Sequence, residues 1–229
     1  MTALLTTALL TTACQSPRGA TAEGRTAPTR TPDRATSSQR APASAPPQTP
    51  DGYEVTVYYT AVESFHSDAK VAVTGCLRRE CSRGDASLGT YPGSFVAAVE
   101  QEGTGRITSG GHAGRYLNWS HDVGYWLDDV PVDSFGGELV PFSSAAGDGM
   151  AEGLRFRLVG PLVDDAGKGL DPHAAERLLG AVWTISDEFT PGLGGPRHVD
   201  LYIGEEDRPF FETTNPLYTT LRGVTVRVV

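Results

Sequence analysis

The chain has 229 residues, 39% of them hydrophobic, so it can bury a core in one or two domains. Its formal net charge is -9 at pH 7, and its lysines and arginines are scattered along the sequence. Nucleic-acid binding requires clustered basic side chains that meet phosphates. We therefore expect no nucleic-acid partner.

The N-terminal segment, residues 1–14, is an uncharged apolar run that ends in Ala13 and Cys14. It is shorter than the roughly 20 residues of a membrane-spanning helix. The run is typical of a signal peptide, and the small residue before Cys14 resembles the lipobox of bacterial lipoproteins. We expect export, either as a lipoprotein anchored through lipid on Cys14 at the outer face of the cytoplasmic membrane or as a secreted protein.

The next segment, residues 15–50, contains seven prolines, many Ala, Ser and Thr, and no aromatic residue. Such a composition cannot bury enough apolar surface to fold, so we expect a disordered linker. All aromatic residues lie in residues 51–229. These residues are expected to form the one folded domain.

Within that domain, alternating and β-branched segments predict strands. The six predicted strands are residues 53–62, 123–127, 153–160, 182–187, 198–203 and 223–229. Helices are predicted at residues 94–103 and 172–180, the second with Asp171 suited to the N-cap and Pro172 to the first helical position. Many short strands with few helices indicate a mainly β fold, either a small barrel or a sandwich.

The cysteines that remain after Cys14 are Cys76 and Cys81, in the segment TGCLRREC. An oxidising compartment would join this even pair into a small disulfide loop. A structural zinc site fits less well, because it needs four ligands and no second Cys or His pair has the usual spacing. The dispersed histidines lack an H-E-x-x-H pattern, so we expect no metal.

Acidic residues interrupt two of the predicted strands. In the strand at 198–203, alternation places His198, Asp200 and Tyr202 on the face opposite the apolar residues. This polar row would suit the lining of a ligand groove, and a solvated sheet face is the open alternative. In the strand at 182–187, the same rule groups Asp187 with Trp183 and Ile185, just before the glycine-rich TPGLGG.

At this point the residues resemble a known family. The segment DEFTPGLGGPRHVDLYIG is similar to the signature D-x-G-G-x-I-K-G-x-x-x-D-[LI]-[YF] of the three-aspartate (3D) domain of the membrane-bound lytic transglycosylase A family. Two upstream segments, VYYTAVESF followed by TG and AAGDGMAEGLRFRLVG, agree with it. The similarity covers residues 53–75 and 145–206, with an insertion at about 76–144. The family's aspartates fall on Asp148, Asp187 and Asp200.

The resemblance implies a double-psi β-barrel, here with one or two short helices and the inserted region. By resemblance Asp200 is the catalytic general acid, and Asp187 orients or tunes it. Contacts to the substrate are expected from six residues: Asp148, Thr60, Tyr59, His198, Tyr202 and Trp126. For Trp126, in an aromatic-rich part of the insertion, stacking on a sugar and ordinary core packing are both open.

The implied activity is cleavage of peptidoglycan glycan strands, in which one acid donates a proton and the substrate's own C6 hydroxyl attacks. The fold also serves polysaccharide binders such as expansins, so fold alone leaves function open. One alternative is a non-catalytic, wall-binding lipoprotein, and another is an exported domain with a structural or partner-binding role. We expect cell-wall polysaccharide as the partner, a monomer, and no cofactor.

Overall fold

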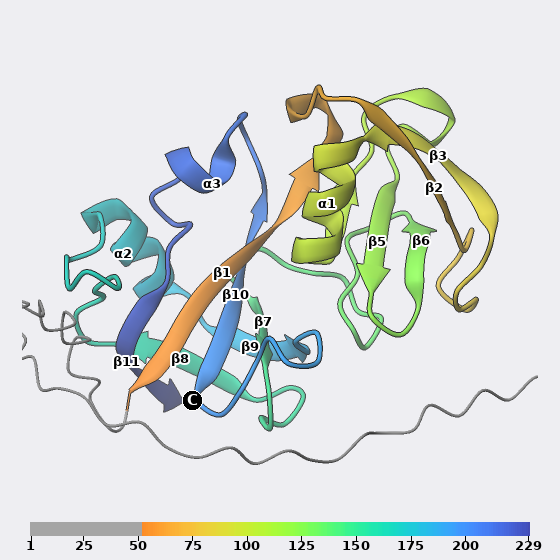
Figure 1. Ribbon diagram of the computed structural model, residues 1–229. Coiled ribbons are helices and arrows are strands. Elements are labelled where there is room, and N and C mark those ends of the chain that lie inside the picture. Colours follow the sequence, from red (N-terminus) through yellow and green to blue (C-terminus); the bar gives the residue numbers. More distant parts are fainter. Residues whose placement is uncertain (1–51) are drawn as a thin grey trace, which may run out of the picture. The chain divides into compact units, whose positions relative to one another are not determined.

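The computed structural model describes residues 52–229 of the chain (Figure 1). The predicted signal peptide with Cys14, and the predicted linker, lie outside the described residues. None of the helices in the described part is long and apolar enough to cross a membrane.

Six strands of the described range close into a barrel, which confirms the mainly β prediction and is consistent with a double-psi β-barrel. The strands are β1 (Tyr53–Val62), β7 (Ser144–Gly147), β8 (Arg155–Val159), β9 (Trp183–Asp187), β10 (His198–Glu205) and β11 (Leu221–Val228). They follow the order β10-β7-β9-β8-β11-β1, and a parallel pairing of β10 with β1 completes the ring. β7 and β9 are also parallel, and the other neighbours are antiparallel.

The barrel interior is filled by the apolar residues of alternating positions. On β10 the side chains of Val199 and Leu201 are fully buried, and on β1 Val55 is fully buried as well. Trp183 of β9 and Phe156 of β8 pack in the same cluster. Because side chains alternate along a strand, Asp200 of β10 and Thr56 of β1 face the outside of the barrel.

The region between β1 and β7 adds a second sheet. It contains η1 (Glu63–Phe65), β2 (Lys70–Gly75), β3 (Ala86–Pro92), α1 (Gly93–Glu102), β4 (Thr104–Arg106), η2 (Gly110–His112), β5 (Tyr116–Ser120) and β6 (Gly124–Asp128). The C-terminal end of β1 pairs with β4, β4 pairs with β5, and β5 pairs with β6, which together form the added sheet. β1 therefore belongs to the barrel at one end and to the added sheet at the other (Figure 1). β2 and β3 form a separate antiparallel pair.

Two further helices follow the barrel strands. α2 (Pro172–Gly180) begins as predicted, because the Asp171 side chain accepts from the backbone N–H groups of His173 and Ala174. α3 (Phe211–Thr214) is a single turn that the sequence did not indicate.

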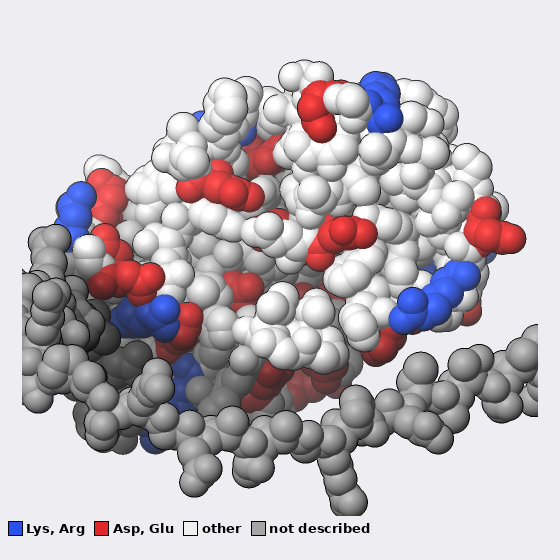
Figure 2. Space-filling model, in the orientation of Figure 1, with Lys and Arg blue, Asp and Glu red and all other residues white. Residues whose placement is uncertain are grey.

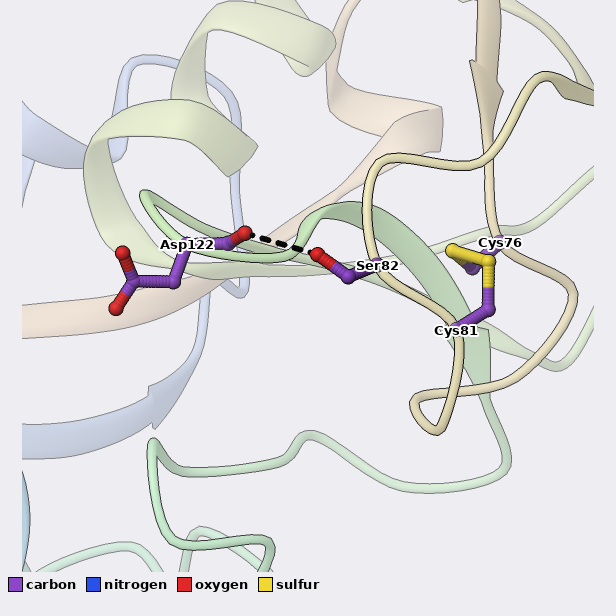
Figure 3. Close-up of a disulfide and its surroundings, with 4 residues drawn as sticks. All are labelled: Cys76, Cys81, Ser82 and Asp122. Atoms are coloured by element: carbon purple, nitrogen blue, oxygen red, sulfur yellow. Dashed lines mark hydrogen bonds between the residues drawn. A yellow bond between two sulfur atoms is a disulfide. The ribbon is translucent and has the colours of Figure 1, made fainter.

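The predicted disulfide between Cys76 and Cys81 is confirmed (Figure 3). Cys76 is buried against Trp126 of β6. The chain that follows is held to the β5–β6 hairpin by the Ser82 hydroxyl, which donates to the Asp122 carbonyl at 3.1 Å (Figure 3). The small covalent loop is therefore fixed to the added sheet.

Candidate functional site

Two of the three predicted aspartates lie in one row across the outside of the barrel. Thr56 of β1 lies opposite Asp200 of β10. On the other side of β10, Asp200 lies opposite Ala146 of β7, and Ala146 in turn lies opposite Asp187 of β9. Neighbouring strands are about 4.8 Å apart, so the Cα atoms of Asp200 and Asp187 are separated by roughly 10 Å. The residue between them is Ala146, whose side chain is only a methyl group and is buried.

A β-bulge brings Asp187 to this face. Strict alternation would group Asp187 with Ile185, but the register of β9 against β7 shifts between these two residues. The extra residue, Ser186, offsets the alternation by one position. Asp187 therefore shares the face of Asp200, and the grouping expected from the sequence is wrong at this one residue.

Asp200 has the environment of a proton donor. Its Oδ1 is buried and has no hydrogen-bond donor among residues 52–229. Burial, together with the charge of Asp187, raises the pKa of the carboxyl to about 7, against the opposing effects of the Thr56 hydroxyl and the Leu201 amide. A carboxyl with this pKa is partly protonated at neutral pH.

Asp187, in contrast, is surrounded by donors. Its Oδ2 accepts from the Tyr58 hydroxyl at 3.0 Å, and its Oδ1 accepts from the Glu188 amide at 2.9 Å. The Ser134 amide at 2.9 Å and the Ser134 hydroxyl also donate to Oδ1. Burial raises the pKa of Asp187, while these donors oppose that rise. The four bonds fix the orientation of the carboxylate.

Asp148 lies with Asp187 in the wall of a cavity of about 310 Å³. The same cavity is lined by Phe135, Glu188 and Phe189. The glycine-rich turn closes on it, because a Cβ at Gly194 would collide with the Asp148 carboxylate and the Phe189 ring. The glycines of TPGLGG therefore allow the backbone to approach an acid of the site.

The polar face of β10 also carries His198 and Tyr202. The His198 Nε2 lies 2.9 Å from the Thr56 Oγ1, and burial lowers the pKa of the imidazole. The Tyr202 hydroxyl lies 2.6 Å from the Thr60 Oγ1, and both side chains are buried. Of the six predicted contact residues, Asp148, His198, Thr60 and Tyr202 are thus placed along the outer face of the barrel or at its rim.

The other two predicted contact residues lie elsewhere. Tyr59 belongs to the main core cluster, where its hydroxyl donates to Glu212 at 3.0 Å and its ring packs on Phe211. Alternation alone places it opposite Thr60, so these two residues do not line one groove. Trp126 is 2% exposed and packs against the disulfide.

Three residues of the site were not identified from the sequence: Tyr58, Ser134 and Glu102. Tyr58 shares the alternation of Thr56 and Thr60, so its face could have been predicted. Ser134 lies in an irregular segment where the sequence has no periodic signal. Glu102 ends α1, where a surface position would have been the default expectation.

Glu102 occupies a gap on the edge of β1. Val55 pairs with β11 and Ala61 pairs with β4, and the Glu102 carboxylate accepts from the Tyr59 amide between them at 3.2 Å. The Tyr218 hydroxyl also donates to it, at 3.2 Å. Burial, and next the charge of Asp200, raise the pKa of Glu102 to about 8. A second protonatable carboxyl thus lies near the row of aspartates.

Acidic and basic side chains are distributed differently on the surface drawn in Figure 2. The acidic ones lie in and around the hollow between the barrel and the added sheet, with basic side chains at the margins. Within residues 52–229 no group of three or more His, Cys, Asp or Glu side chains is arranged to hold a metal ion.

Comparison with known proteins gives limited similarity. No protein-family model and no curated protein matches the chain. Solved structures that are partly similar include Escherichia coli MltA with bound chitohexaose, at 12% identity over 77% of this chain and 71% of that chain, with a TM-score of 0.47. A membrane-bound lytic murein transglycosylase from Agrobacterium tumefaciens has 11% identity over 77% and 73%, with a TM-score of 0.46. The lytic transglycosylase LtgG of Burkholderia pseudomallei has 12% identity over 76% and 72%, with a TM-score of 0.40.

Proposed function

We propose that the protein cleaves cell-wall glycan, most specifically as a peptidoglycan lytic transglycosylase that uses Asp200 as its general acid and base. The observation that carries this proposal is the buried Oδ1 of Asp200, which has no hydrogen-bond partner among the described residues and lies in one row with the fully hydrogen-bonded Asp187. A buried polar atom without a partner is costly. A substrate atom that hydrogen-bonds to it would remove that cost.

In this mechanism, the protonated Asp200 donates to the glycosidic oxygen as the bond to the anomeric carbon breaks. The C6 hydroxyl of the same sugar attacks that carbon and gives its proton to the Asp200 carboxylate. The product is a 1,6-anhydro sugar, and the enzyme returns to its starting protonation state. A pKa of about 7 suits a group that must first donate and then accept a proton.

Asp187 is better suited to positioning than to attack. A hydrolase that retains configuration uses its second carboxylate as a nucleophile, and one that inverts uses it to activate water. Both oxygens of Asp187 already accept hydrogen bonds from protein donors. Its charge instead raises the pKa of Asp200. This difference between the two carboxyls favours the single-acid mechanism over hydrolysis.

The cavity beside Asp187 offers surfaces that suit a sugar. Phe135, which is 43% exposed, and Phe189 provide apolar ring faces, and Asp148 provides acceptors for hydroxyl groups. A purely binding protein would be expected to present an open row of Trp and Tyr. Trp126 and Tyr202 are buried instead, which favours catalysis over binding alone.

Export, with lipid on Cys14 or by secretion, is part of the proposal and rests on the sequence. The intact mass of the protein recovered from the membrane fraction tests it. A diacylglycerol-modified N-terminal cysteine is the expected species, and an unprocessed chain in the cytoplasm would contradict export.

The test of the activity is incubation of the full chain with peptidoglycan sacculi, followed by mass analysis of the soluble products. We expect anhydro-sugar products from the wild type and from the matched control Asp122→Asn, whose side chain is exposed. Asp200→Asn should release none. No release by the wild type between pH 4 and 8 would reject the proposal.

A further inference from the structure

The Asp187 carboxylate is held in part by Ser134, a residue outside the barrel strands. Two of the four donors to Asp187 are the amide and the hydroxyl of Ser134. Ser134 lies in a turn between β6 and β7 that is closed by a bridge between Val132 and Glu138. The orientation of Asp187 therefore depends on where this turn lies.

The turn is itself well fixed. The Asp133 carboxylate accepts from the amides of Phe135 at 3.0 Å and Gly137 at 2.7 Å. The Asp133 amide donates to the Gly137 carbonyl at 2.9 Å. These bonds hold residues 133–137 together as one compact turn.

Arg79 anchors this turn to the disulfide loop. Its Nη2 donates to the carbonyl of Ser134. Its guanidinium also lies on Gly136, where a Cβ would collide with it. Arg79 is within the loop closed by Cys76 and Cys81. A continuous set of contacts thus runs from the disulfide loop through Arg79 and Ser134 to Asp187.

We infer that Arg79 and Ser134 are positioning residues for Asp187, and that through them the disulfide loop sets the charge beside Asp200. This inference deepens the proposed function, because it matters for catalysis only if Asp200 is the acid. The effect of Arg79 and Ser134 on the two aspartates is a property of the free protein and can be measured without substrate.

The effect of Ser134 on the pKa of Asp200 has a definite direction. The Ser134 hydroxyl lowers the pKa of Asp187, so its loss raises that pKa and favours the neutral form. The charge of Asp187 raises the pKa of Asp200. Weakening that charge therefore lowers the pKa of Asp200. The acid then loses its proton at a lower pH, and the alkaline limb of the activity profile moves toward lower pH.

The experiment compares four variants of the full chain. Ser134→Ala removes the hydroxyl donor, and Ser134→Thr restores it. Arg79→Ala removes the anchor, and Arg78→Ala removes the same charge one residue earlier, where the side chain is exposed. The Asp200 carboxyl is titrated by carbon NMR without substrate, and the pH dependence of release from sacculi is measured in parallel.

We expect the Asp200 midpoint to fall in Ser134→Ala and, by less, in Arg79→Ala, and to stay unchanged in Ser134→Thr and Arg78→Ala. Release above neutral pH should drop roughly tenfold in Ser134→Ala, with a smaller loss at pH 5. An unchanged Asp200 midpoint in folded Ser134→Ala, with activity lowered equally at every pH, would overturn the inference. If the midpoint falls but the wild type cleaves no glycan, the effect of Ser134 on the pKa of Asp200 stands and the proposed function fails.

Discussion

At the scale of single residues, the burial of Asp200 has opposite consequences for chemistry and for stability. A carboxyl with a pKa of about 7 keeps a proton to donate near neutral pH. Once ionised, the same group is a buried charge whose Oδ1 has no donor in the described residues. Because its pKa is raised on folding, its stabilising contribution is complete below the ordinary value of about 4 and is lost as the pH rises through about 7.

Asp200→Asn should therefore be more stable than the wild type in alkaline solution. The amide is neutral at every pH, so the cost of burying the charge disappears. We expect a gain in the free energy of unfolding on the order of a few kcal/mol at pH 8 and little difference near pH 4. Urea unfolding at the two pH values measures this. If the free energies of unfolding of the variant and the wild type differ equally at both pH values, Asp200 is not the titrating group.

At the scale of elements, the turn after β9 shapes the site through one close contact. Gly194 lies against the Asp148 carboxylate and the Phe189 ring, both in the wall of the cavity. Gly194→Ala should displace Asp148 and cost about 1–3 kcal/mol of stability. Binding of glycan fragments, measured by calorimetry, should weaken.

The matched control for this turn is Gly169→Ala. A Cβ there would meet no atom within 4 Å. We expect its stability and its glycan binding to equal those of the wild type. If Gly194→Ala behaves in the same way as Gly169→Ala, the turn does not control the position of Asp148.

A second prediction at this scale concerns α1, which contacts β1 through Glu102. The pKa of Glu102 is raised to about 8, so the stability that its protonated form provides is lost as the pH rises through that value. Glu102→Gln should remove this loss, so that its free energy of unfolding varies less than that of the wild type between pH 7 and 9. Guanidinium unfolding across this range tests the prediction. The control is Glu176→Gln, at an exposed position, whose free energy of unfolding should depend on pH as that of the wild type does.

Strands and helices with a clear local signal were predictable. β1 and β10 follow from alternation, and α2 from its N-cap at Asp171. β7 was missed, because its sequence SAAG has no large or β-branched residue. Asp187 was assigned to the wrong face, because a bulge depends on the register of two strands and not on one strand's pattern.

At the scale of the whole molecule, β1 joins two parts that both contribute to the site. The barrel supplies Asp200, Asp187 and Asp148, and the region between β1 and β7 supplies Ser134 and Phe135. The three aspartates were predicted from the resemblance to a family. Ser134 could not be predicted, because its role arises from a contact between residues more than fifty positions apart. Local sequence has no information on such a contact.

The most direct test of the central claim is to digest sacculi with the full chain in water labelled with oxygen-18. In a lytic transglycosylase the substrate's own hydroxyl attacks, so the products should be 1,6-anhydro sugars without label, and Asp200→Asn should form none. Products that carry one labelled oxygen at the new reducing end would mean that water attacks, which contradicts the single-acid mechanism. Unlabelled products formed equally by Asp200→Asn would contradict the role of Asp200.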